Sequence, residues 1–253
     1  MTTMGDSTGQ LDIGRVIQLM FGVLGRNFVT FLVLALALVG LPSLLVGIAQ
    51  LNFLKAGDPF SWQTSVSGII SGLGALILQA TLIYGAVTDL NGRHATVADC
   101  LSIGLRSFLP LIAIGIMFYL AIFFGTILLI VPGLMIATAW CLCIPVFVVE
   151  HPGLLASFGR SAELTRGNRW RVFAVFVLYI VALLIIELVF GVVNSAMRVA
   201  GGGSPTAIVA LVVNPLLYVA NALIGSTGIS VLYVELRRVR DGVGAEGLAA
   251  IFD

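Results

Sequence analysis

The stretch that decides the fold runs from Ser107 to Val149 and reads SFLPLIAIGIMFYLAIFFGTILLIVPGLMIATAWCLCIPVFVV, without a charged residue. It is about twice as long as the ~20 apolar residues that one helix needs to cross a ~30 Å hydrocarbon core. The dipeptide Pro132-Gly133 falls inside it, where a tight turn would be expected. We therefore expect two membrane helices joined by a turn, over residues 109–130 and 134–149.

The rest of the chain has the same apolar character. Of its 253 residues, 59% are hydrophobic and only 10% are charged, and the mean hydropathy is +1.12. A soluble globular protein carries about 25% charged residues, because its surface faces water. The apolar residues also come in long runs, which indicates that lipid is the solvent. The net charge of +1 gives no indication of a nucleic-acid partner.

Four further apolar stretches predict an all-α fold, a polytopic membrane helix bundle with six transmembrane helices. These stretches cover residues 28–48, 66–87, 170–193 and 207–234. The first apolar run is longer than the ~7–15-residue core of a secretory signal peptide, so we expect it to be retained as a span. The expected organisation is a disordered tail over 1–10, one membrane domain over 11–236 and a cytoplasmic tail over 237–253.

The basic residues are divided unequally between the two sides that these spans define. One side receives Lys55 and Arg198, and the opposite side receives the other 11 of the 13 Lys and Arg residues. Loops rich in Lys and Arg face the cytoplasm. We therefore expect a multi-pass protein of the bacterial cytoplasmic (inner) membrane, with both termini in the cytoplasm. The residues on the basic side are Arg15, Arg26, Arg93, Arg106, Arg160, Arg166, Arg169, Arg171, Arg237, Arg238 and Arg240.

A similar pattern precedes each expected pair of spans. Amphipathic segments begin near Ile13, Thr96 and Leu154, and each ends with a basic residue near an aromatic one. Thr96 and Asp99 also have the spacing of a capping box. Amphipathic helices with basic groups lie in the membrane interface. The pattern predicts three hairpins, each preceded by a cytoplasmic interfacial helix. Alternatively, basic and aromatic anchors of this kind occur at span edges in any inner-membrane protein.

Polar side chains at membrane depth give the first candidate site. Glu187 is the one ionisable residue well inside an expected span, and such residues mark functional sites by default. Asn194 follows on its helical face, and Asn214 and Asn221 form a stripe on the sixth span. We expect Glu187 and Asn214 at similar depth, within hydrogen-bond reach. Two interpretations stay open: polar contacts that pack spans five and six together, or the path of a small transporter or permease subunit.

The sequence contains no recognisable set of catalytic, cofactor-binding or metal-binding residues. We find no Ser-His-Asp set and no paired carboxylates at one depth. His94 and His151 lie in different loops, and neither has a cysteine, histidine or carboxylate clustered with it at ligand spacing. We therefore expect a protein that is not an enzyme and that carries no cofactor and no metal.

Four segments carry a resemblance to a known family: LLIVPGL (128–134), PVFVVE (145–150), RSAELTRGNRW (160–170) and LYVELR (232–237). This series resembles the membrane domain of glycerophosphoryl diester phosphodiesterases and related stand-alone bacterial inner-membrane proteins. The resemblance covers roughly the third span to the end of the chain. In the enzymes of that family, catalysis is associated with a separate soluble barrel after the membrane part, and this chain ends where that barrel would begin.

The resemblance therefore implies the membrane module without its catalytic domain. It implies association with membrane lipids or with another membrane protein, in envelope lipid homeostasis. The matching positions, together with Arg169, form a candidate cluster at the cytoplasmic face, for which a structural role and a lipid-headgroup role are both open. These residues are Glu150, Arg160, Glu163, Thr165, Arg166, Arg169, Tyr233 and Arg237.

Overall fold

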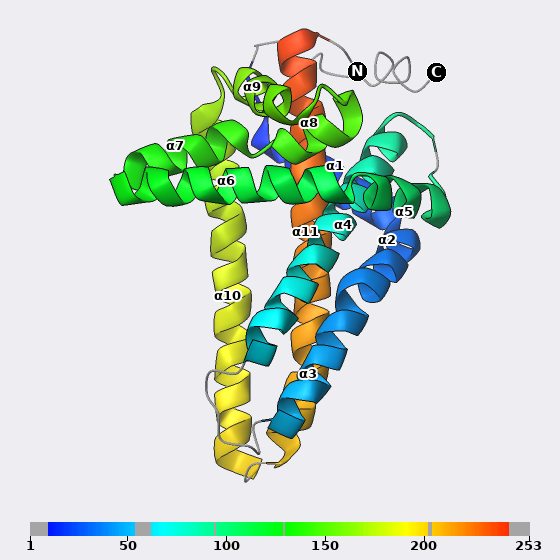
Figure 1. Cartoon of the computed structure of the whole chain (residues 1–253), viewed down its shortest axis with the longest axis vertical. Coiled ribbons are helices and arrows are strands. Elements are labelled where there is room, and N and C mark those ends of the chain that lie inside the picture. Colours follow the sequence, from blue (N-terminus) through cyan, green and yellow to red (C-terminus); the bar gives the residue numbers. More distant parts are fainter. Residues whose placement is uncertain (1–9, 54–61, 94, 129, 202–203, 243–253) are drawn as a thin grey trace, which may run out of the picture.

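A computed structural model of the chain describes residues 10–53, 62–93, 95–128, 130–201 and 204–242. Every regular element in these ranges is a helix (Figure 1). Six apolar helical stretches are long enough to cross a membrane, which confirms the expected all-α fold with six such stretches. They are Phe28–Ile48, Gly72–Leu90, Phe108–Ile127, Val131–Glu150, Arg169–Val192 and Pro215–Asp241. The expected tails lie largely outside the described residues, and the last helix continues five residues beyond the expected domain end, to Asp241.

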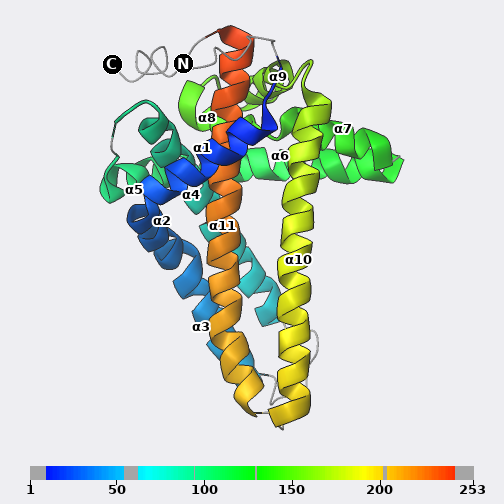
Figure 2. The same ribbon diagram turned by 180° about the vertical axis from the view of Figure 1, so that it is seen from behind.

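Four of the six stretches run along the long axis of the molecule (Figures 1 and 2). They are built from α2 (Phe28–Ala35), a π-helical turn η1 (Leu36–Gly40), α3 (Leu41–Phe53), α4 (Trp62–Leu90), α10 (Arg169–Gly201) and α11 (Ser204–Asp241). The central helix is α11, which contacts α4, α10 and the first stretch. Only 6% of the α10 span is buried, so most of its apolar surface is free to face lipid.

Three shorter helices occupy the segments that precede the expected hairpins. They are α1 (Ile13–Arg26), α5 (Val97–Arg106) and α9 (Leu154–Leu164), and they lie near one end of the molecule (Figure 1). The predicted capping box of α5 is confirmed, since Thr96 N and Asp99 N each donate a hydrogen bond of 3.2 Å to the other residue's side chain. All 11 arginines of the basic side belong to this end, which we call the arginine-rich end.

The uncharged stretch forms a hairpin of α6 (Phe108–Leu128) and α7 (Ile130–Trp140), but this hairpin lies across the other helices. Figures 1 and 2 both show it near the arginine-rich end, crosswise to α10 and α11. The expected turn at Pro132-Gly133 is helical instead: Pro132 lies in the first turn of α7, where a missing N–H is tolerated. Gly133 permits the close approach of the two helices, because a Cβ there would lie 2.4 Å from Thr126 Oγ1.

The fourth expected span, 134–149, is interrupted. Two helices occupy it, α7 and α8 (Cys143–Glu150), separated by a two-residue turn. Pro145 contributes to the break because it has no N–H for the carbonyl four residues earlier. Ser161 of α9 occupies the gap: its Oγ donates to Ala139 O at 2.8 Å and accepts from Leu142 N at 3.1 Å. The hydroxyl thus replaces helix hydrogen bonds that the turn removes.

Two glycines of α4 that lie two residues apart have opposite environments. A Cβ at Gly74 would lie 2.3 Å from the carbonyl oxygen of Leu38 in the π-helical turn, whereas Gly72 has no such neighbour within 4 Å. We expect Gly74→Ala to lower the free energy of unfolding by about 1–3 kcal/mol through overpacking. Gly72→Ala should leave it unchanged or raise it, because alanine favours helix. Thermal unfolding of both variants in detergent measures the difference, and equal stabilities would contradict this packing.

Candidate functional site

Six polar side chains meet where α8, α9 and α11 come together at the arginine-rich end. We call this group the Glu150 cluster, and it consists of Glu150, Arg160, Glu163, Tyr233, Arg237 and Asp241. Five of the eight residues of the expected cytoplasmic-face cluster are in it.

The carboxylate of Glu150 is the centre of the cluster. Its Oε1 accepts a hydrogen bond from Tyr233 Oη at 2.9 Å and lies 3.7 Å from Arg237 Nε. Its Oε2 accepts from Arg160 Nε at 3.1 Å. The side chain of Glu150 is 16% exposed, so two arginines and a tyrosine take the place of most of its water. Charge-assisted hydrogen bonds of this kind are about twice as strong as neutral ones.

Arg160 extends the cluster to the end of α11. Its Nη1 donates to Glu163 at 3.2 Å, and its Nη2 pairs with Asp241. Oδ2 of Asp241 also lies 3.6 Å from Nε of Arg237, which is one helical turn earlier in α11. Burial alone would lower the pKa of Arg160, but Asp241 and Glu150 raise it on balance. The guanidinium therefore stays charged and joins two carboxylates from different helices.

Asp241 was not among the residues expected from the sequence. The expected membrane domain ended at residue 236, so the next turn of α11 was assigned to a tail. The i,i+4 spacing of Arg237 and Asp241 was the available signal, because such pairs share one face of a helix.

The other three expected residues lie outside the Glu150 cluster. Thr165 is fully buried, and its hydroxyl donates to the backbone carbonyl of Ser161, four residues earlier, at 3.1 Å. Arg166 is exposed and has no ion pair within the described ranges. The Nε of Arg169 is buried without a hydrogen-bond partner in the described part of the chain.

The segment before α1 is held by residues that begin α10. Leu11 N donates to Asn168 Oδ1 at 3.0 Å, and Leu11 O accepts from Arg171 Nη1 at 2.5 Å. Leu11 itself is completely buried. These contacts join positions about 160 residues apart, and no spacing in the sequence indicated them.

Two ion pairs tie α1 to the long helices. Arg26 contacts buried Asp89 at the end of α4, with its Nη2 2.6 Å and its Nε 3.1 Å from Oδ2. Arg15 Nε lies 3.1 Å from Oε1 of Glu235, a buried residue of α11. Ion pairs of the arginines at this end thus join α1 to α4, α1 to α11 and α9 to α11.

Among the described residues, the arginine-rich end carries more positive than negative side chains. Its 11 arginines stand against seven carboxylates there: Asp12, Asp89, Asp99, Glu150, Glu163, Glu235 and Asp241. Arg106, Arg166 and Arg240 are exposed and form no ion pair within the described part. Exposed arginines at a membrane surface attract anionic phosphates.

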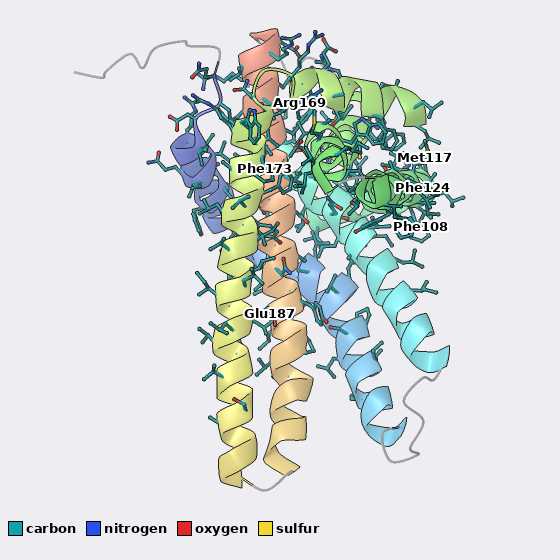
Figure 3. The ribbon with its side chains drawn as sticks, turned by 90° about the vertical axis from the view of Figure 1, so that its left-hand side faces the viewer. Phe108, Met117, Phe124, Arg169, Phe173 and Glu187 are labelled. Atoms are coloured by element: carbon teal, nitrogen blue, oxygen red, sulfur yellow. The ribbon has the colours of Figure 1, made fainter. Side chains whose placement is uncertain are left out.

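The expected intramembrane polar site is brought together only in part. Glu187 is exposed midway along α10 and forms no hydrogen bond with the described residues (Figure 3). Asn221 Oδ1 accepts from the hydroxyl of Tyr179, joining α10 to α11. This antiparallel pairing places position 187 level with positions 213–214, in agreement with the depth expected for Glu187 and Asn214. The side chains of Asn194 and Asn214 lie outside the described residues, as does the expected Glu187–Asn214 hydrogen bond.

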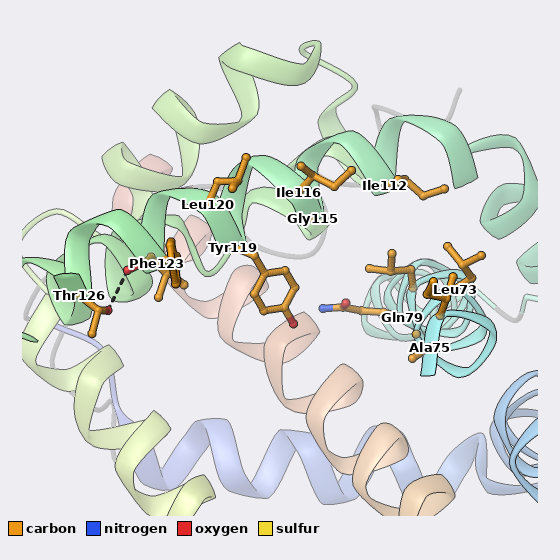
Figure 4. A pocket seen from close by; sticks show the side chains of 14 residues that line it. Leu73, Ala75, Gln79, Ile112, Gly115, Ile116, Tyr119, Leu120, Phe123 and Thr126 are labelled. Carbon is orange, nitrogen blue, oxygen red and sulfur yellow. Dashed lines mark hydrogen bonds between the residues drawn. The ribbon is translucent and has the colours of Figure 1, made fainter. Parts of the chain in front are cut away.

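A groove of about 1050 Å³ lies between α4 and α6 (Figure 4). Its walls are apolar except for Gln79, Tyr119 and Thr126. Residues of α4 and α6 line it together because the hairpin crosses α4, and this crossing was not visible in the sequence. Within the described residues, no three His, Cys, Asp or Glu side chains are grouped for metal binding.

Comparison of the chain with protein-family models, with curated proteins and with solved structures found no match.

Proposed function

We propose that this chain is a non-enzymatic, lipid-binding protein of the bacterial inner membrane, whose arginine-rich end faces the cytoplasm and binds anionic phospholipid headgroups. The observation that carries this proposal is the unequal charge at that end, where exposed Arg106, Arg166 and Arg240 have no carboxylate partner in the described part of the chain. A role in envelope lipid homeostasis, as the resemblance to the phosphodiesterase membrane domain implies, agrees with such binding.

We infer the placement of the helices in the membrane from their directions. A membrane normal along α10 and α11 lets the four long stretches cross the bilayer and puts α1, α5 and α9 toward the same side of it, with α5 level with the α6–α7 hairpin and α9 beyond the hairpin (Figures 1 and 2). The same normal makes the α6–α7 hairpin parallel to the membrane plane. Because this hairpin has no charged residue, we place it in the hydrocarbon of the inner leaflet and not in water.

The Glu150 cluster has a supporting role in this proposal. It joins α8, α9 and α11 and so fixes the helices next to which Arg166 and Arg240 lie in the chain. Unlike a catalytic pair, its carboxylates are occupied by arginine and tyrosine partners. We therefore assign it to positioning the basic surface.

A transporter would need a path to Glu187. In the described part of the chain, the groove is lined by α4 and α6 and does not include α10, where Glu187 lies. We therefore favour lipid binding over transport.

Native mass spectrometry of the protein, purified in mild detergent and supplied with phosphatidylglycerol or phosphatidylcholine, tests the proposal. We expect preferential retention of phosphatidylglycerol, and a roughly 10- to 100-fold loss in the triple variant Arg106→Gln, Arg166→Gln, Arg240→Gln, since each surface arginine contributes ~1 kcal/mol. The matched triple lysine variant, which keeps the charge, should retain the preference. Equal retention of both lipids by the unaltered protein would overturn the proposal.

A further inference from the structure

We propose that the groove between α4 and α6 holds one acyl chain of an inner-leaflet glycerophospholipid, with the ester carbonyl of that chain at Gln79 and Tyr119. This inference rests on the proposed lipid-binding function and assigns it a hydrocarbon site.

The groove lies where α6 crosses α4. Gly115 of α6 faces Leu76 of α4, since a Cβ at Gly115 would lie at an ordinary van der Waals distance, 3.9 Å, from the Leu76 side chain. The α4 wall includes Ile69, Gly72 and Leu73, and none of the lining residues carries a charge. A cavity of about 1050 Å³ is at the upper end of the ~300–1,000 Å³ of typical ligand sites.

The direction of α4 sets the depth of the groove in the membrane. Gln79 is nearer to the arginine-rich end, and Ile69 is farther from it, because α4 ends at that end with Leu90 (Figure 1). Ten residues of helix span about 15 Å. That length is half of the ~30 Å hydrocarbon core, and therefore the depth that the acyl chains of one leaflet fill. A chain lying along this face would run from the inner headgroup region toward the bilayer centre.

Two polar side chains of the groove lining, Gln79 and Tyr119, face each other. Figure 4 shows the hydroxyl of Tyr119, on α6, directed toward the side-chain amide of Gln79, on α4. Neither side chain forms a hydrogen bond with other described residues, whereas Thr126 bonds Ile122 O of its own helix at 2.8 Å. A hydroxyl and an amide both donate hydrogen bonds, and leaving them unpaired in hydrocarbon is costly. The ester carbonyl of a glycerophospholipid supplies an acceptor at this depth.

A charged group lies near one end of the groove. Arg106 is exposed, has no ion pair in the described ranges, and precedes α6 by two residues. The groove lining on α6 begins at Ile112, about one turn into that helix. The helix therefore places a positive charge near the Ile112 end of the groove.

Photocrosslinking tests the assignment on the full-length protein in vesicles. The probes are phosphatidylglycerol and phosphatidylcholine that carry the same diazirine-labelled acyl chain, and crosslinked peptides are mapped by mass spectrometry. We expect crosslinks in residues 69–79 and 112–126. Gly72→Trp, which places an indole in the groove, should reduce them at least fivefold. The matched control is Gly191→Trp on α10, because Gly191 is also exposed, with no neighbouring side chain within 4 Å of a Cβ.

The two probes separate this inference from the proposed function. Groove crosslinks of equal yield with both lipids would support the acyl-chain site and overturn the headgroup preference. Crosslinks that favour phosphatidylglycerol, but lie outside the groove or persist in Gly72→Trp, would overturn the acyl-chain site alone. Thermal unfolding of both tryptophan variants confirms that they are folded before the crosslinks are compared.

Discussion

Replacing Glu150 with alanine is expected to lower the free energy of unfolding by about 3–5 kcal/mol, the cost of leaving buried charges without their partner. The change removes the acceptor for Tyr233 Oη and for Arg160 Nε, at 2.9 and 3.1 Å. It also leaves Arg160 and Arg237 near each other with Asp241 as their shared carboxylate. Thermal unfolding in detergent, with intrinsic fluorescence as the readout, measures the loss.

Glu163→Ala is the matched control in the same cluster. Its carboxylate also contacts Arg160, at 3.2 Å, but the side chain is 52% exposed. Exposed ion pairs contribute about 0–1 kcal/mol, so this variant should unfold close to the original temperature. If both variants lost the same stability, Glu150 would not be the centre of the cluster. If neither lost any, the cluster would not hold α8, α9 and α11 together.

The sequence predicted the features that depend on composition and local spacing. Long uncharged runs predicted six apolar helical stretches, and the first of them, Phe28–Ile48, has the expected bounds. The capping box of Thr96 and Asp99 could be predicted because it depends on two residues only three positions apart. These features are set within one helix or at one helix end, so they need no knowledge of tertiary packing.

Features that depend on how distant segments pack were not predicted. The break before α8 is stabilised by Ser161, which is 19 residues from the N–H that it accepts, in another helix. The close contact of Gly74 with Leu38 involves the π-helical turn, and no residue pattern predicted that turn. The crosswise hairpin is the largest such difference: an uncharged stretch of this length fits a spanning pair and an in-plane pair equally well.

The candidate sites were also predicted only in part. The resemblance brought Glu150, Arg160 and Tyr233 to attention, and the structure brings them into contact. Glu187 was selected because it is the ionisable residue in an apolar run, yet in the structure it is an exposed residue of α10. The groove could not be predicted, because it is formed where two helices from different expected hairpins, α4 and α6, cross each other.

The lipid-binding proposals depend on the hairpin staying in the inner leaflet, with the arginine-rich end facing the cytoplasm. Three single-cysteine variants report on this arrangement: Val131→Cys near the hairpin tip, Ser195→Cys toward the far end of α10, and Arg240→Cys at the arginine-rich end. Val131 is 65% exposed, and the other two residues are also exposed, so each new thiol is accessible on the protein surface. The native Cys100, Cys141 and Cys143 are replaced by alanine in each variant, because Cys141 is only partly buried.

Labelling of intact cells with a membrane-impermeant maleimide is the most direct test. Ser195 lies 26 residues into α10, about 40 Å from the start of that helix, and should be labelled from outside. Arg240→Cys should react only after the membrane is permeabilised. Val131→Cys should stay unlabelled in intact cells, because the hairpin tip lies in the inner leaflet. Labelling of Val131→Cys from outside to the level of Ser195→Cys would mean that the hairpin crosses the membrane, and would contradict the account.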